Sequence, residues 1–238
     1  GNANTNLIYN LSDKSEFTTN FINTGKTYSP CPDVYFTHGP QFNKILNSYF
    51  KSSKIIGPLK YDNNLVLKKR NNFFKTKRER KKNILICPSI GDHEIILNFL
   101  KLSVNDKHNF FLSPHPVYSK YVNEYLVTLK KNCKIFYSKN KTTNELLKKT
   151  DLVICGFSTI AQEAAILGIP SIRLLNLEKP FFHDIQDRIK IVSDAKILKS
   201  ILKKENFNIF LGNKKLIEKK FYNKLDNKAF MRFEQFLR

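Results

Sequence analysis

The sequence lacks a long apolar run, a signal-peptide pattern and any C-x-x-C pair. A membrane-spanning helix needs about 18–20 consecutive apolar residues. No run among the 238 residues approaches that length, so no spanning helix is predicted. Three of the four cysteines (Cys87, Cys133 and Cys155) lie inside apolar runs, which is typical of buried, reduced thiols. We therefore expect neither a disulfide framework nor a cysteine metal site, and we predict a cytoplasmic location.

Methionine is also scarce, because Met231 is the only one in the chain. A native start at Gly1 is therefore not expected. We interpret the chain either as a processed protein or as part of a longer gene product.

Acidic residues are few: 20 Asp and Glu stand against 41 Lys and Arg, which gives a formal net charge of +21. Such an excess favours an anionic partner, namely nucleic acid, a phospholipid surface or a phosphorylated substrate. The alternative is that the base composition of the genome enriches Lys and Asn. The most basic stretch lies in residues 63–82, which we interpret as an exposed linker. It is either a solvated connector or a segment attracted to anionic headgroups at the inner face of a membrane.

From residue 83 onward, short apolar runs alternate with segments of helical spacing. The predicted strands are 83–87, 109–112, 133–137, 152–155, 171–175 and 189–192. The predicted helices are 93–102, 117–131, 143–149, 158–167 and 195–203. Such alternation predicts an α/β domain over residues 83–205, with a Rossmann-like, doubly wound parallel sheet covered on both faces.

The flanking regions predict a second, incomplete α/β lobe. In residues 1–62, strands at 34–37 and 54–56 enclose a helical pattern at 41–50, and each strand is stopped by Gly-Pro. This is the pattern of a final β-α-β portion whose beginning is absent. Residues 206–238 predict amphipathic helices that pack back across the lobes.

In an open parallel sheet, ligands bind beyond the carboxyl ends of the strands where the strand order reverses, here predicted between 83–87 and 152–155. The second of these strands is followed by Gly156, Phe157, Ser158 and Thr159 at a helix start. Glycine, unpaired amides and hydroxyls together favour a phosphate. The alternative is a capping box between Thr159 and Gln162 that needs no ligand. One turn on, Glu163 either accepts hydrogen bonds from ribose or is an ordinary first-turn glutamate.

Two further loops leave neighbouring predicted strands. His115 lies between Pro114 and Pro116, which restrict its backbone, so its imidazole can meet a phosphate or protonate a leaving oxygen. The alternative is a histidine that simply ends a strand. The loop at 88–94 contributes Ser89 and Gly91 as candidate donor contacts. His38 is a candidate cleft contact from the first lobe, although a lone loop histidine is more often incidental.

The motifs at 114–116, 151–159, Glu163 and 168–170 resemble the donor domain of GT-B-fold bacterial surface-polysaccharide glycosyltransferases. An His-Pro motif with a Ser-Thr motif is similar to the CMP-binding signature of bacterial sialyltransferases and Kdo transferases. Related patterns occur in CDP-glycerol transferases and UDP-N-acetylglucosamine 2-epimerases. Residues 32–39 and 54–57 look like the end of the acceptor lobe. The resemblance covers roughly residues 31–238.

This resemblance implies metal-independent, inverting transfer of a sugar from a nucleotide donor, expected to be CMP-linked, to a surface or lipid-linked glycan. His115, Ser158 and Thr159 would hold the donor phosphate, and no metal or cofactor is expected. The chain departs from the family pattern, because the general base of the N-terminal lobe has no counterpart here. The alternatives are an epimerase or hydrolase of the same fold, a catalytically inactive scaffold, and a nucleic-acid-binding protein, which the absence of a known binding motif disfavours.

Overall fold

The computed structural model describes residues 34–37, 39–40, 43–44, 52–57, 59, 81–89, 91–137, 139–175, 189–203, 207, 226 and 228–238. The chain divides into two compact units. The first contains Gly1–Asn64, Phe181–His183 and Lys215–Arg238. The second contains Leu65–Pro180 and Asp184–Lys214. Each unit is described separately below.

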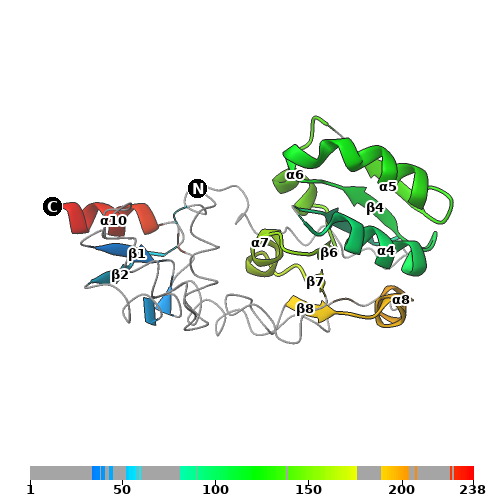
Figure 1. Cartoon of the computed structure of the whole chain (residues 1–238). Coiled ribbons are helices and arrows are strands. Elements are labelled where there is room, and N and C mark those ends of the chain that lie inside the picture. The colour runs from blue at the N-terminus through cyan, green and yellow to red at the C-terminus, as the bar shows by residue number, and fades with distance from the viewer. Residues whose placement is uncertain are drawn as a thin grey trace, which may run out of the picture. The chain divides into compact units, whose positions relative to one another are not determined.

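The second unit contains a sheet of six parallel strands (Figure 1). They are β3 (Asn83–Cys87), β4 (Asn109–Leu112), β5 (Lys134–Tyr137), β6 (Leu152–Cys155), β7 (Ser171–Leu174) and β8 (Ile189–Val192). Their spatial order is β5-β4-β3-β6-β7-β8, so the order reverses between β3 and β6. The predicted Rossmann-like, doubly wound sheet is therefore confirmed, and the reversal lies where the sequence placed it.

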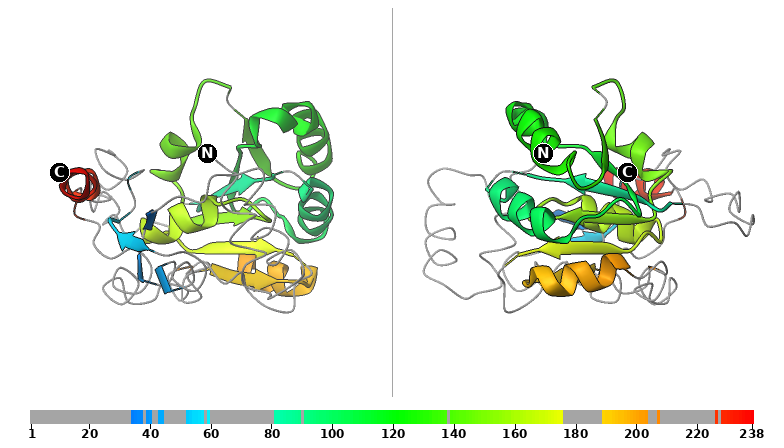
Figure 2. Two further views of the ribbon diagram at one scale, coloured as in Figure 1. Left: turned by 60° about the vertical axis from the view of Figure 1, so that its left-hand side comes forward. Right: turned by 90° about the vertical axis from the view of Figure 1, so that its right-hand side faces the viewer.

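Helices connect these strands in the predicted places. They are α4 (His93–Ser103), the 3-10 turn η3 (Pro116–Tyr121), α5 (Val122–Leu129), α6 (Thr143–Leu147), α7 (Ile160–Ile166) and α8 (Ala195–Lys203). The helix predicted at 117–131 instead opens with a 3-10 turn, and the helix predicted from 158 begins at 160. Right-handed crossovers place α4 and α5 on one face of the sheet and α6 and α7 on the other. α8 packs beside α4 (Figure 2).

The centre of the sheet forms the hydrophobic core. All four residues of β6 and of β7 are buried, as are four of the five residues of β3. The edge strand β5 instead alternates exposed and buried positions, as expected where one face meets solvent. Each fully buried aliphatic side chain contributes about 1.5–3 kcal/mol. The core thus holds the carboxyl ends of β3 and β6 at fixed positions side by side.

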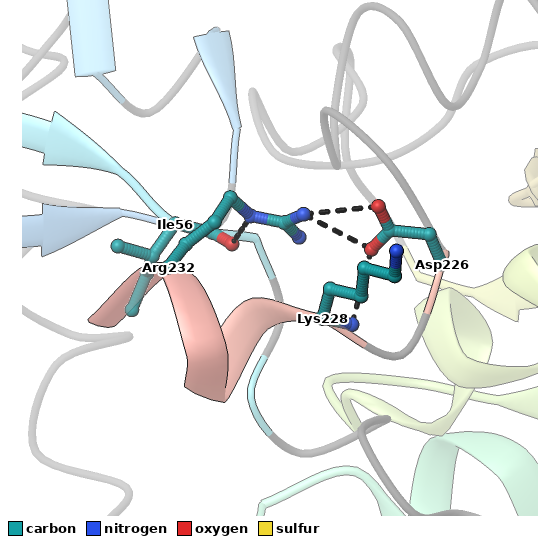
Figure 3. A network of polar contacts seen from close by, with 4 residues as sticks. All are labelled: Ile56, Asp226, Lys228 and Arg232. Carbon is teal, nitrogen blue, oxygen red and sulfur yellow. Dashed lines mark hydrogen bonds and ion pairs between the residues drawn. The ribbon is translucent and has the colours of Figure 1, made fainter. Parts of the chain in front are cut away.

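In the first unit, two short parallel strands, β1 (Tyr35–Thr37) and β2 (Ser53–Ile55), contact the last helix, α10 (Ala229–Leu237). The ring of Phe36 meets that of Phe233 edge-on, with centroids 4.9 Å apart. The Arg232 Nε donates to the carbonyl of Ile56 at 2.6 Å, and its Nη1 donates to both carboxylate oxygens of Asp226 (Figure 3). The two predicted strands are confirmed.

Several expectations concern residues that the structure does not describe. They include His38, most of the predicted helix at 41–50, the basic linker at 63–82 apart from its last two residues, and much of 206–238. Within the described residues no helix is long and apolar enough to cross a membrane. Cys87, Cys133 and Cys155 are buried, as predicted, and among the described residues none of them forms a disulfide.

Candidate functional site

Three loops meet at the carboxyl edge of the sheet because they leave the adjacent strands β4, β3 and β6. The loop after β4 is tied to the loop after β3 by the His115 amide, which donates to the Pro88 carbonyl at 3.0 Å. The loop after β3 is tied to the turn after β6 by Asp92, whose Oδ2 accepts from the Phe157 amide at 2.6 Å. The structure thus brings together the three segments that the sequence singled out.

The backbone of His115 is held in place by its neighbours in the sequence and by a hydrogen bond to another loop. Its backbone bond to Pro88 adds to the restriction imposed by the flanking prolines. Two residues earlier, the Ser113 hydroxyl shares a hydrogen bond of 2.8 Å with the Thr143 hydroxyl at the start of α6. His115 itself is half-buried. Its backbone is therefore fixed at the carboxyl edge of the sheet, one strand away from the switch point, and its role toward a phosphate stays a prediction.

The turn from Gly156 to Thr159 passes from the interior to the surface. Gly156 is buried, Ser158 is half-buried and Thr159 is exposed. Thr159 caps α7 by position, but its side chain makes no capping hydrogen bond, so the alternative of a Thr159–Gln162 capping box is wrong. The Ser158 hydroxyl instead accepts from the Ile160 amide at 3.3 Å. Among the described residues, the amides of Ser158 and Thr159 have no hydrogen-bond partner.

Asp92 is the main residue of this site that sequence reasoning missed. It has no solvent-exposed surface, and its two carboxylate oxygens accept from two loops. Oδ1 takes the Ser89 amide at 2.6 Å, and Oδ2 takes the Phe157 amide. Burial raises the pKa of Asp92, while these amide bonds and the nearby charges of His93 and Arg173 act in the opposite direction. Asp92 thus joins the two strands at the point where the order reverses.

Arg173 is the second missed residue. It lies in the middle of β7, has no exposed surface and is the largest fully buried side chain among the described residues. Its Nη1 donates to the carbonyls of Gly156 and Ser158, the latter at 2.9 Å. The sequence did carry a signal for it, since a charge inside an apolar strand run must find partners when the strand is buried. Arg173 thus binds two carbonyls of the 156–159 turn from the buried side of that turn.

Gly156 is required by its neighbour Asp92. A Cβ placed on Gly156 would lie 2.4 Å from the Asp92 Oδ2 and 2.7 Å from its Cγ. The sequence interpretation attributed this glycine to close approach of a ligand. In the structure the Asp92 carboxylate occupies that space, and it also binds the Phe157 amide, which the sequence predicts as a contact of the donor phosphate.

The remaining predicted donor contacts lie around this turn. Glu163 follows on α7 and is only 8% exposed, so it is largely withdrawn from solvent. Ser89 is half-buried in the loop after β3. Gly91 is exposed, with a φ of 81° that favours glycine in the turn before α4. Their contacts with a donor stay predictions.

One aromatic arrangement at this edge was also not anticipated. The ring of His93, the first residue of α4, stacks on the ring of Tyr121 at the end of η3, with centroids 3.9 Å apart. The ammonium group of Lys120 lies 5.0 Å from the centre of the Tyr121 ring. The Tyr125 hydroxyl donates to the His93 carbonyl at 2.7 Å. These contacts join the start of α4 to the segment that follows His115.

Comparison with known proteins gives structural matches only. No protein-family model matches the chain, and neither does any curated protein sequence. The wall teichoic acid polymerase TagF superposes with a TM-score of 0.58 at 16% identity, over 93% of this chain and 60% of that one. A TagF variant soaked with CDPG gives 0.55 at 17% identity, over 93% and 59%. Sucrose-phosphate synthase from Thermosynechococcus elongatus gives 0.53 at 13% identity, over 97% and 65%.

These likenesses show the fold. The neighbours are GT-B glycosyltransferases, so the predicted fold class is confirmed: an α/β architecture with a six-stranded parallel sheet. The chain spans about three fifths of the length of the TagF structures. Among the described residues, no three His, Cys, Asp or Glu side chains gather into a group that could hold a metal ion.

Proposed function

We propose that this chain binds the nucleotide-activated donor of a GT-B glycosyltransferase that moves a sugar to a surface or lipid-linked glycan. The observation that carries the proposal is the convergence of three loops at the switch point of the sheet. They contribute Ser89, His115 and the 156–159 turn. Ligands of doubly wound sheets bind at this place. The net charge of +21 supports an anionic donor.

Within this site, we assign the donor phosphate to the Ser158–Thr159 part of the turn and to His115. Backbone amides at a helix start and a preset imidazole are suited to negative charge that grows on a leaving phosphate. An acceptor hydroxyl attacks the sugar carbon as a general base takes its proton, and the nucleotide leaves with the bonding electrons. The base is not assigned to a residue of this chain. We propose a CMP-linked sugar as donor and a cytoplasmic site of action.

Titration calorimetry with CMP, CDP and UDP tests the assignment. The wild-type chain is expected to bind a cytidine nucleotide, and His115→Ala and the double variant Ser158→Ala/Thr159→Ala are expected to bind it at least about tenfold more weakly. Ser200→Ala is the matched hydroxyl control, because Ser200 is exposed on α8. It should bind like the wild type.

Other outcomes count against this function. Absence of nucleotide binding by the wild type refutes it, and so does equal binding by His115→Ala. Steeply salt-dependent binding to single-stranded nucleic acid supports the nucleic-acid alternative instead. Release of free sugar from a nucleotide sugar without an acceptor supports an epimerase or hydrolase.

We further propose that the basic linker at 63–82 attracts the chain to anionic membranes. The support is its composition, since each basic residue near an anionic surface contributes about 1 kcal/mol. In a sedimentation assay, the chain should pellet with phosphatidylserine-containing vesicles at low salt and stay in the supernatant at high salt. Equal sedimentation with neutral vesicles contradicts the proposal.

A further inference from the structure

The peptide group between Gly156 and Phe157 is held at both ends by buried charges. Its carbonyl accepts from the Arg173 guanidinium, and its N–H donates to the Asp92 carboxylate at 2.6 Å. In a trans peptide these two groups point in opposite directions, and none of the described peptide bonds is cis. Asp92 and Arg173 therefore grip one peptide plane from opposite sides, which fixes the rotation of that plane.

The same guanidinium also fixes the orientation of the peptide group between Ser158 and Thr159. Arg173 donates to the Ser158 carbonyl at 2.9 Å. The N–H in that peptide group belongs to Thr159, so it points away from the buried guanidinium. Thr159 is exposed, and its amide has no partner among the described residues. The grip on the turn thus directs the carbonyls inward and leaves the Thr159 amide facing outward at the start of α7.

The chemistry of each partner fits this task closely. Aspartate offers two acceptor oxygens on a short stem, and both are used, by amides from two different loops. Arginine offers several donors in a rigid fork, which suits two carbonyls of one turn. Two apolar side chains would fill this space with less desolvation. A buried charged pair at this position is therefore better explained by control of backbone orientation than by packing.

We propose that Asp92 and Arg173 are positioning residues that orient the 156–159 turn for the phosphate of the nucleotide donor. This inference rests on the proposed function. Neither side chain touches the ligand, because both are completely buried. Each acts by fixing the orientation of the peptide groups of the turn.

Asp151 provides a matched control for Asp92. It ties the same two strands at their opposite ends, since its Oδ2 accepts from the Asn83 amide at 2.8 Å at the start of β3. Asp92→Ala and Asp151→Ala therefore each remove a carboxylate bond between β3 and β6. Only the first is next to the candidate site.

Titration calorimetry with CMP, alongside urea unfolding of each variant, separates positioning from stability. Asp92→Ala is expected to weaken CMP binding by between about tenfold and a hundredfold, because it removes the bond that fixes the turn and so misaligns hydrogen bonds to the phosphate. Asp151→Ala should stay within about twofold of the wild type. Arg173→Met should weaken binding like Asp92→Ala, and Arg173→Lys should restore part of it. Equal affinities for Asp92→Ala and the wild type overturn the inference and leave the proposed function intact.

Hydrogen exchange on the unliganded chain tests the grip without a ligand. Asp92→Ala should accelerate exchange of the Phe157 amide by at least about tenfold, whereas Asp151→Ala should accelerate Asn83 instead. If Asp92→Ala does not fold, Asp92→Asn replaces it in both experiments. Asparagine keeps the shape of the aspartate side chain but has one acceptor oxygen fewer. Wild type that binds no nucleotide refutes the proposed function. An unchanged exchange rate of the Phe157 amide in Asp92→Ala would show that Asp92 does not hold this peptide group, and it would overturn the inference.

Discussion

The contact between Gly156 and Asp92 gives the sharpest stability prediction. Alanine at position 156 would place its Cβ 2.4 Å from the Asp92 Oδ2 and 2.7 Å from both Cβ and Cγ. Carbon atoms in contact stay about 3.5–4.0 Å apart, so the two residues must separate by about 1 Å. That movement would lengthen the bond between Asp92 and the Phe157 amide, now 2.6 Å, beyond hydrogen-bonding range.

The expected cost has two parts. Overpacking costs about 1–3 kcal/mol, and loss of a hydrogen bond to a buried carboxylate costs about 1.5–3 kcal/mol. Gly156→Ala should therefore lower the free energy of unfolding by about 2.5–6 kcal/mol. Gly91→Ala is the control: a Cβ there meets nothing within 4 Å, and only its positive φ opposes the change. That strain costs about 1–2 kcal/mol.

Urea unfolding followed by circular dichroism measures both variants, and a double-mutant cycle identifies the cause. In an Asp92→Gly background the collision is absent, so the added cost of Gly156→Ala should fall below about 1 kcal/mol. The cost of Gly91→Ala should persist in that background. If the two substitutions at 92 and 156 are additive, or if Gly156→Ala costs no more than Gly91→Ala, the Asp92 contact is not the reason for glycine.

Three further predictions follow from burial and from the contacts of α10. Burial raises the pKa of Asp92 above its ordinary value, so the native state binds this proton more tightly than the unfolded chain does. The free energy of unfolding should therefore fall as the pH rises from the ordinary pKa of aspartate through the raised one, and Asp92→Asn should reduce that slope in urea unfolding from pH 4 to 7. Burial raises the pKa of Cys133 to about 11, so this thiol should resist alkylation at pH 8 until the chain unfolds, as mass spectrometry can show. Arg232→Ala removes the bond to the Ile56 carbonyl and should destabilise the attachment of α10 by about 1–3 kcal/mol, which speeds proteolysis near the C-terminus, whereas Arg238→Ala should not.

The fold was predictable because its signals are local and repeated. Apolar runs such as 152–155 are too short and too continuous for anything but buried strands, and helical segments separate them. The handedness of crossovers then restricts the strand order. The 3-10 turn at Pro116–Tyr121 was not predicted, because helical spacing does not distinguish a 3-10 start from an α-helical one.

The site was predictable only as a set of loops. Position in the topology selected the loops that carry His115 and Ser158, since that argument needs nothing beyond strand order. Asp92 escaped notice because an aspartate before a helix is ordinarily a cap, and only the fold shows that its oxygen reaches Phe157, which lies 65 residues away. The reason for glycine at position 156 could not be predicted either, because it depends on the same contact with Asp92. Arg173 could have been found, because a charge within a central strand must be satisfied by neighbouring backbone or side chains.

The internal hydrogen bonds of the 156–159 turn also limit the number of backbone amides that a phosphate could bind. A helix start offers several amides to an anion, but here the Phe157 amide is already bound to Asp92 and the Ile160 amide to the Ser158 hydroxyl. Among the described residues, the amides of Ser158 and Thr159 have no hydrogen-bond partner, and these are the two amides that the proposed function assigns to the phosphate. A phosphate can accept from more donors than these two amides supply, so the proposed function adds donors from the other loops at this edge of the sheet. The loop after β4 is tied to the loop after β3 through the bond from the His115 amide to the Pro88 carbonyl, and the loop after β3 is tied in turn to the 156–159 turn through Asp92. The use of the Phe157 and Ile160 amides within the fold thus supports the role that we propose for His115, and the calorimetry of His115→Ala tests that role.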